Sequence, residues 1–324
     1  MKKVWLAVFL FFPLTTFAWN ETTHRILALE SLRNVAPSWE LDKKIVVTPF
    51  SQFLASFSKT EPTVQTREDF ARWLQINPES PFDQPVFLET VGGVTTPLEI
   101  LYLHSPSADD GRDKELSYHQ LTQFWFGGMH KASSQAFRHI EKVPFDPLHP
   151  LNTFGFPLGT VGEASERAEI YFQLAVRAKK IGEEYWAWNF LGIGLHYIQD
   201  LQQPYHTMQL SLPLLLKGGF SIQKIAKEIS DSHHAFEDKV MEEMETPAKR
   251  HWILALRGEE TFDSSLFPPD KEKIRNLAKL IRNFANKSAY DTVRTPDPVD
   301  QIVLENFIFQ GKAIRTVVKT FKEE

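Results

Sequence analysis

The sequence of 324 residues contains no cysteine. This absence excludes disulfide bridges and every zinc site built on thiolates, so a metal could be held only by histidine, aspartate, glutamate or backbone groups. The chain also lacks an excess of positive charge, because its formal net charge is −5. It therefore offers no broad basic surface for duplex nucleic acid.

Long apolar runs are scarce as well, and the run at the start of the chain is too short to anchor the protein in a membrane. Lys2 and Lys3 precede this run, which covers residues 4–12, and small Ala18 follows it. The order is typical of a secretory signal peptide. We expect residues 1–18 to be removed, leaving an exported protein, periplasmic or secreted, that begins at Trp19 and has no integral membrane anchor.

Alternating strand patterns and internal repeats are absent from the sequence too. Apolar residues instead recur at helical spacing, which predicts one mostly helical, all-α domain over residues 19–324. We expect a monomer with no protein partner. The expected helices cover residues 21–32, 68–74, 97–103, 163–182, 183–201, 221–245, 271–286 and 299–321, with an irregular helix over 42–58 that Pro49 breaks and an irregular region over 105–162.

One expected helix carries potential metal ligands. His196 and Asp200 stand four residues apart, so both project from one helix face, and Pro204 ends the helix just before His206. An imidazole and a carboxylate one turn apart can approach one cation with little rearrangement. Because the surrounding residues are apolar, the pair needs a partner, which is either a metal or a hydrogen bond within the pair.

Two further segments offer ligands of the same kind. His233 and Glu237 repeat the four-residue spacing in a later expected helix. If Trp19 becomes the N-terminus, its amino nitrogen and carbonyl oxygen form a five-membered chelate, and His24 follows little more than one helical turn later. The chain therefore predicts a metal-bound interior.

Together these segments resemble the signature of the zinc-dependent phospholipase C and S1/P1 nuclease superfamily. The matching elements are Trp19-x4-His24, His196-x3-Asp200-x5-His206 and His233-x3-Glu237. The stretch 171–206 also resembles the phospholipase C branch in its pattern YF-x-LA followed by LG-x-x-LHY-x-x-D-x-x-QP-x-H. The resemblance implies a nearly all-α fold, three clustered zinc ions in a cleft between helices, and hydrolysis of a phosphodiester.

The family pattern also requires an aspartate between the first and second elements. The segment SADDGRD offers Asp109, Asp110 and Asp113. We take Asp109, because an Ala-Asp step in a loop resembles the family's first aspartate. Asp110 and Asp113 remain alternatives.

A histidine is required in the same interval. We take His139, because the segment SSQAFRHIE resembles bacterial relatives in which an aromatic residue shortly precedes the ligand. His149 remains the alternative, since its spacing to His196 is closer to that of the compact bacterial phospholipases. We prefer His233 to His234 because an aromatic residue then stands directly before the acid, as in the family. The other histidines are expected on the surface or in loops: His104, His119, His130, His234 and His251.

The resemblance assigns the ligands to three zinc ions. The first would be held by Asp109, His139, His196 and Asp200; the second by Trp19, His24 and the bridging Asp200; the third by His206, His233 and Glu237. The resemblance also suggests that Asp109 accepts the proton of the attacking water. On general grounds, two neighbouring cations lower the pKa of a shared water from about 15.7 towards ~7.

The expected substrate is a phospholipid. The resemblance of residues 171–206 favours it, as do Glu237 in place of aspartate and the apolar stretch 212–220. Single-stranded nucleic acid is the alternative substrate, because the short Trp-x4-His spacing resembles the S1/P1 branch. Trp186 and Trp188 follow a helical pattern that predicts a place in the core rather than a role in base stacking. A third interpretation is an exported zinc-binding protein without catalysis, which would need closed coordination shells.

Overall fold

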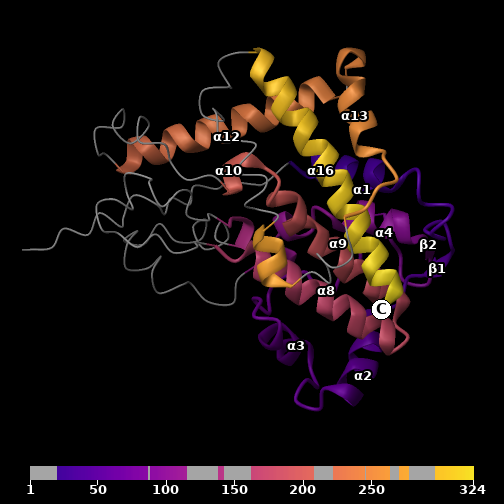
Figure 1. The fold of residues 1–324 in the computed structure, drawn as a ribbon. Helices are drawn as coiled ribbons and strands as arrows, with labels where there is room; N and C mark the ends of the chain where they lie inside the picture. Colours follow the sequence, from indigo (N-terminus) through magenta and orange to yellow (C-terminus); the bar gives the residue numbers. More distant parts are fainter. Residues whose placement is uncertain are drawn as a thin grey trace, which may run out of the picture.

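The computed structural model describes residues 20–86, 88–114, 138–141, 162–207, 222–244, 246–262, 270–276 and 296–324. These residues are mostly helical, with one small sheet, and this confirms the predicted helical character (Figure 1). The helices are α1 (Glu21–Leu32), α2 (Phe50–Thr60), α3 (Arg67–Trp73), α4 (Pro97–His104), α8 (Ala164–Lys180), α9 (Glu184–Asp200), α10 (Pro204–Thr207), α12 (Ile222–Met244), α13 (Arg250–Leu256) and α16 (Pro296–Glu323).

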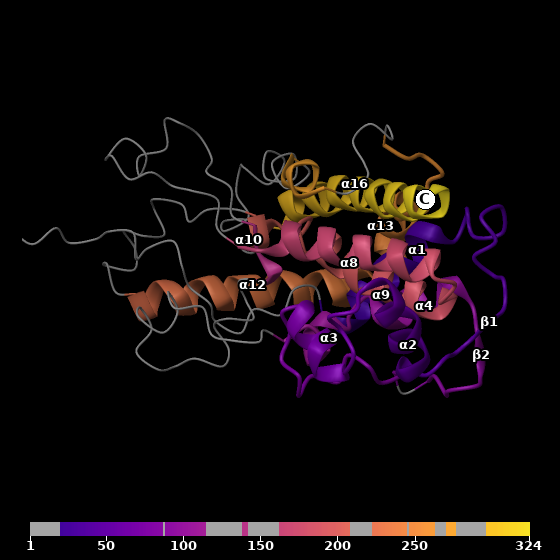
Figure 2. The same cartoon turned by 90° about the horizontal axis from the view of Figure 1, so that it is seen from below.

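Helices α8 and α9 form the centre of the structure. They are joined by a short turn at Gly182, whose φ of 82° is readily adopted only by glycine. Every residue of α9 from Tyr185 to Asp200 is buried, as expected of a helix covered on all sides. Figure 2 shows α16 on one side of this pair and α2 and α3 on the other.

Aromatic side chains fill the space between α9 and the helices α2 and α3. Phe53 lies 5.2 Å from Phe190 and 5.8 Å from Trp186, measured between ring centroids. On the opposite side, Trp188 meets Phe321 of α16 at 4.8 Å. The prediction that both tryptophans belong to the core is therefore confirmed.

Helix α4 approaches α9 closely because Gly192 has no side chain. A Cβ added at Gly192 would lie 2.9 Å from the Cβ of His104. Helix α4 then ends, and a π-helical turn over Ala108–Arg112 follows it. The end of α4 and this turn therefore lie beside the C-terminal half of α9, which carries His196 and Asp200.

The structure corrects several expected elements. Residues 42–58 hold a two-residue strand, β1 (Ile45–Val46), and α2 begins only after Pro49. Strand β1 pairs antiparallel with β2 (Val94–Thr95), and neither strand was predicted because two residues are too few to show an alternating pattern. Helix α13 was missed as well.

Other expectations were confirmed within the described residues or lie outside them. Helix α1 has the predicted bounds, and Asn20 caps it by accepting a hydrogen bond from the Thr23 N–H. Residues 271–276 are helical, whereas residues 277–286 lie outside the described part, as do the signal sequence and the stretch 212–220. Among the described helices, none has the length and apolar character needed to cross a membrane.

Candidate metal centre

The C-terminal end of α9 forms one wall of a buried cluster of imidazoles and carboxylates. His196 and Asp200 are fully buried there, with 3.2 Å between His196 Nε2 and Asp200 Oδ2. The chain turns after Asp200, and the short helix α10 brings buried His206 back towards the same region. The predicted effect of Pro204, which ends α9 before His206, is thus seen in the structure.

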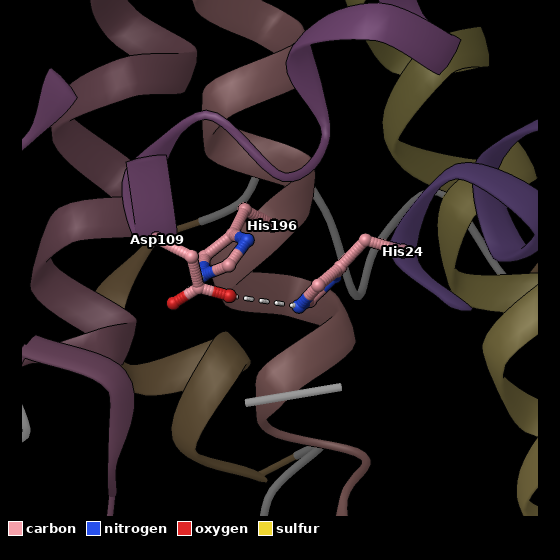
Figure 3. A group of neighbouring side chains, drawn as sticks. All are labelled: His24, Asp109 and His196. Atoms are coloured by element: carbon pink, nitrogen blue, oxygen red, sulfur yellow. Dashed lines mark ion pairs between the residues drawn. The ribbon is translucent and has the colours of Figure 1, made fainter. Parts of the chain in front are cut away.

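Three other segments bring ligands to this helix end. His24 comes from α1, Asp109 from the π-helical turn, and His139 from residues 138–141. Figure 3 shows His24, Asp109 and His196 close together, with a dashed line between the Asp109 carboxylate and His24. Residues far apart in the sequence therefore meet at one buried point.

Each carboxylate of this cluster faces two groups of nitrogen atoms. Asp109 Oδ1 lies 3.6 Å from His139 Nδ1 and 3.7 Å from His196 Nε2, while its Oδ2 lies 3.6 Å from His24 Nε2. Asp200 repeats this arrangement: Oδ2 lies 2.8 Å from His139 Nδ1, and Oδ1 lies 3.5 Å from His24 Nε2. Each aspartate thus directs one oxygen at His139 and His196 and the other at His24, while the rings of His24 and His196 stack with 4.1 Å between their centroids.

The side towards His24 holds three polar atoms without a hydrogen bond. These are His24 Nε2, Asp109 Oδ2 and Asp200 Oδ1, and all three are buried. A buried polar atom left without a hydrogen bond costs roughly 1–3 kcal/mol. The two carboxylate oxygens lie 3.6 and 3.5 Å from His24 Nε2, so one cation bound there could satisfy all three atoms together.

A second cluster forms where α10 meets α12. His206, His233 and Glu237 are all buried, and their nearest ligand atoms lie within 4.8 Å of one another. Gln203 donates an amide hydrogen bond of 2.9 Å to Glu237 Oε1, which fixes the orientation of this carboxylate. Burial raises the pKa of Glu237 well above its ordinary value.

The histidines are oriented by hydrogen bonds on their outer nitrogens. His196 Nδ1 donates to the main-chain oxygen of Ser105 at 2.8 Å, and His206 Nδ1 donates to that of His139 at 2.5 Å. A carbonyl oxygen can only accept, so Nδ1 carries a proton, and Nε2 is the nitrogen through which each ring would bind a metal. This carbonyl–imidazole arrangement is typical of histidines that bind metals.

The close packing of these groups changes their pKa values. Burial raises the pKa of Asp109 to about 6. Burial alone would lower the pKa of His196, but the charges of Asp200 and Asp109 outweigh it and raise that pKa to about 9. For His24, burial and the neighbouring His196 lower the pKa well below 6.5. A cation entering this cluster would displace shared protons, so binding would release protons to the solvent.

The structure brings together all the predicted ligands that it describes. These are His24, Asp109, His139, His196, Asp200, His206, His233 and Glu237. Trp19 lies outside the described residues, as do the rival His149 and the unassigned His119 and His130. His234 and His251 are partly exposed, as expected.

Neither alternative to Asp109 belongs to the two clusters of potential metal ligands. Asp110 is exposed and belongs to neither cluster. Asp113 is fully buried and accepts hydrogen bonds from Arg138 at 2.7 Å, from Arg167 at 2.9 Å and from the Tyr171 hydroxyl at 2.9 Å. We call Asp113 and these partners the arginine cluster.

One histidine prediction was wrong. His104 was expected on the surface or in a loop, but it is fully buried at the end of α4. Its Nε2 lies 3.0 Å from Glu89 Oε2, and Asn189 of α9 contacts the same ring. Burial outweighs Glu89 and lowers the pKa of His104. The error arose because the apolar sequence around His104 gives no sign of its polar partners, which come from distant segments.

Gln199 and Gln203 are functional candidates that sequence reasoning missed. Gln203 holds Glu237, and Gln199 contacts His24, with 2.5 Å between Oε1 and Nδ1. A signal was present: three glutamines lie close to Asp200, at positions 199, 202 and 203, beside an apolar helical stretch where buried amides need specific partners.

Comparison of the chain with protein-family models, with curated proteins and with solved structures found no match.

Proposed function

We propose that this protein is an exported, zinc-dependent phosphodiester hydrolase of the phospholipase C type. The observation that carries the proposal is the convergence of His24 Nε2, Asp109 Oδ2 and Asp200 Oδ1, which are buried and make no hydrogen bond. A purely structural polar cluster would satisfy such atoms within the protein. Their common direction therefore supports a bound cation.

The donor atoms suit zinc. All are imidazole nitrogens or carboxylate oxygens, which zinc accepts in catalytic sites. On the resemblance, Asp109, His139, His196 and Asp200 would hold one ion, His24 and Asp200 would join the Trp19 terminus around a second, and His206, His233 and Glu237 would hold a third. In the structure Asp109 Oδ2 also faces His24, at 3.6 Å from its Nε2. The third ion would have three protein ligands, the number typical of catalytic rather than structural zinc.

Zinc, when bound, supplies Lewis-acid chemistry: it lowers the pKa of water and stabilises negative charge on phosphodiester oxygens. The protein's own residues position the reacting groups. Asp109 takes up the proton of the attacking water in this proposal, and its 10 % exposed side chain supports the role, since the side chains of His24 and Asp200 are fully buried. The reaction therefore meets solvent on the Asp109 side of the cluster.

A phospholipid is the proposed substrate, on the resemblance of residues 171–206 to the phospholipase C branch. The core positions of Trp186 and Trp188 add support, because buried rings cannot stack on nucleobases. Single-stranded nucleic acid is the second candidate, favoured by the spacing between Trp19 and His24.

The test is hydrolysis by purified protein that begins at Trp19, with its N-terminus and zinc content verified. Phosphatidylcholine vesicles and single-stranded DNA are offered in parallel, with and without chelator. Chelator-sensitive release of phosphocholine supports the proposal, and release of nucleotides alone would assign the protein to the nuclease branch. Zinc without either activity would contradict hydrolysis of these substrates.

A matched pair of variants locates the chemistry. Asp109→Asn should abolish hydrolysis, because it weakens a ligand and removes the proton acceptor. Asp110→Asn alters the neighbouring, exposed carboxylate and should leave hydrolysis unchanged. Equal activity of the two variants would contradict the role assigned to Asp109.

A further inference from the structure

Gln199 is buried within α9, one position before Asp200, and its side chain reaches across to α1. There it contacts His24 at two points. The amide oxygen lies 2.5 Å from His24 Nδ1, and the amide nitrogen donates a 3.3 Å hydrogen bond to the main-chain oxygen of His24. The Gln199 side chain thus contacts both the imidazole ring and the main chain of His24.

These two contacts determine where the proton of His24 resides. The main-chain oxygen of His24 can only accept a hydrogen bond, so the amide nitrogen of Gln199 must face it. The amide oxygen must then face Nδ1, and an oxygen in that place requires Nδ1 to carry the proton. Nε2 is left with a lone pair directed at Asp109 and Asp200.

His24 differs in this respect from His196 and His206. His196 and His206 donate to main-chain oxygens, which no substitution removes. His24 lies inside α1, where main-chain oxygens are engaged in the helix, and it donates to a side chain instead. Its orientation can therefore be altered by changing one distant residue.

We infer that Gln199 is a positioning residue that holds His24 as its Nδ1–H tautomer and so presents Nε2 to a cation. The inference about the cation rests on the proposed function, whereas the tautomer does not. Loss of hydrogen-bond partners that orient metal-bound histidines typically weakens metal binding 10–100-fold. We expect a loss of this size for the ion that His24 would hold.

The first measurement is NMR of the metal-free full-length chain with ¹⁵N-labelled histidine, where a His24→Gln variant assigns the signals. The wild-type protein should show His24 as the Nδ1–H tautomer. Gln199→Met removes both contacts while keeping the length of the side chain, and it should give a mixture of tautomers. A wild-type Nε2–H tautomer would overturn the inference without any variant.

The second measurement is zinc binding by the wild type and three variants. Gln199→Met should weaken one class of site 10–100-fold. Gln199→Glu should recover part of this loss, because a carboxylate still accepts from Nδ1 but cannot donate to the main-chain oxygen. Gln202→Met is the control: Gln202 is buried in the turn that follows α9, and its amide bonds the main-chain oxygen of Ile198 rather than a ligand. Its zinc binding should equal that of the wild type.

The outcomes separate this inference from the proposed function. Equal zinc affinity in Gln199→Met and Gln202→Met would overturn the positioning role. A wild-type protein that binds no zinc, yet shows the Nδ1–H tautomer, would overturn the proposed function and the role towards a cation while leaving the tautomer assignment in place.

Discussion

Two buried acidic clusters lie side by side in this protein and are built in opposite ways. In the arginine cluster, Asp113 is surrounded by groups that donate to it, two of them permanently charged guanidinium groups. In the metal centre, Asp109 and Asp200 face imidazoles, and each keeps one oxygen without a hydrogen bond. The two arrangements begin only four residues apart, at Asp109 and Asp113.

The difference separates a structural from a functional use of buried charge. A buried carboxylate is costly unless the protein neutralises it, and Asp113 is neutralised by the chain itself. The candidate metal centre instead leaves His24 Nε2, Asp109 Oδ2 and Asp200 Oδ1 without a hydrogen bond. The two clusters are adjacent on α9. Tyr197 donates a hydrogen bond to Asp113 of the arginine cluster, whereas the preceding residue, His196, contacts Asp200.

The largest effect is expected from breaking the metal centre. Asp200→Asn removes the carboxylate that faces both groups of nitrogens, so it should lower hydrolysis roughly a thousandfold or more, a loss of several kcal/mol of transition-state stabilisation. Zinc analysis should show that only the ion near His206, His233 and Glu237 is retained. Full activity after loss of the other two ions would disprove the mechanism.

A substitution in the arginine cluster should lower the free energy of unfolding, rather than act directly on hydrolysis. Asp113→Asn leaves Arg138 and Arg167 buried without their counter-charge, which should cost about 3–5 kcal/mol of unfolding free energy. Urea denaturation of metal-free protein measures this cost apart from zinc. A loss below about 1 kcal/mol would mean that these arginines find other partners or solvent.

The pH dependence of stability tests whether the arginine cluster depends on an ionised Asp113. Burial would raise the pKa of Asp113, but the charges of Arg138 and Arg167 outweigh it and hold that pKa below its ordinary value of 3.8. A carboxyl whose pKa is lower in the folded state stabilises the protein above the unfolded-state pKa, and this stabilisation fades as pH falls through the folded-state pKa. The stability difference between wild type and Asp113→Asn should be constant from about pH 7 to 5 and shrink below about pH 4. A difference that shrinks near pH 6 would point to another group.

An exposed ion pair gives the smallest effect and serves as the reference for both clusters. Lys43 and Glu184 lie 3.1 Å apart, but their side chains are 59 % and 47 % exposed. Solvent screens such a pair, so Lys43→Ala should change the unfolding free energy by less than about 0.5 kcal/mol. A larger change in urea denaturation would show that burial is not what distinguishes the three sites.

Local patterns in the sequence were sufficient for the helices and for the ligands within one helix. Asn20 predicted the start of α1, and four-residue spacing predicted that His196 and Asp200 share a face. The same information could not separate Asp109 from Asp113, because that choice depends on arginines 25 and 54 residues further along the chain. Long-range partners of this kind leave no periodic signal.

The hydrogen-bond partners that orient these histidines could not be predicted from the sequence for the same reason. Gln199 and His24 are 175 residues apart, and Ser105 and His196 are 91 apart. Only the packing of α1 and α4 against α9 brings each pair into contact. The sequence could therefore indicate which imidazoles and carboxylates come together, but not which residues orient them.

The absent side chain of Gly192 has a consequence for protein engineering. Replacing glycine by alanine inside a helix is a common route to a more heat-resistant protein, gaining about 1 kcal/mol where space allows. Here the new methyl group would meet the Cβ of His104 at 2.9 Å and push α4 away from α9. The end of α4 supplies the Ser105 oxygen that orients His196 and leads directly into Asp109. Selection for heat resistance at this position would therefore disturb the orientation of His196 and the place of Asp109.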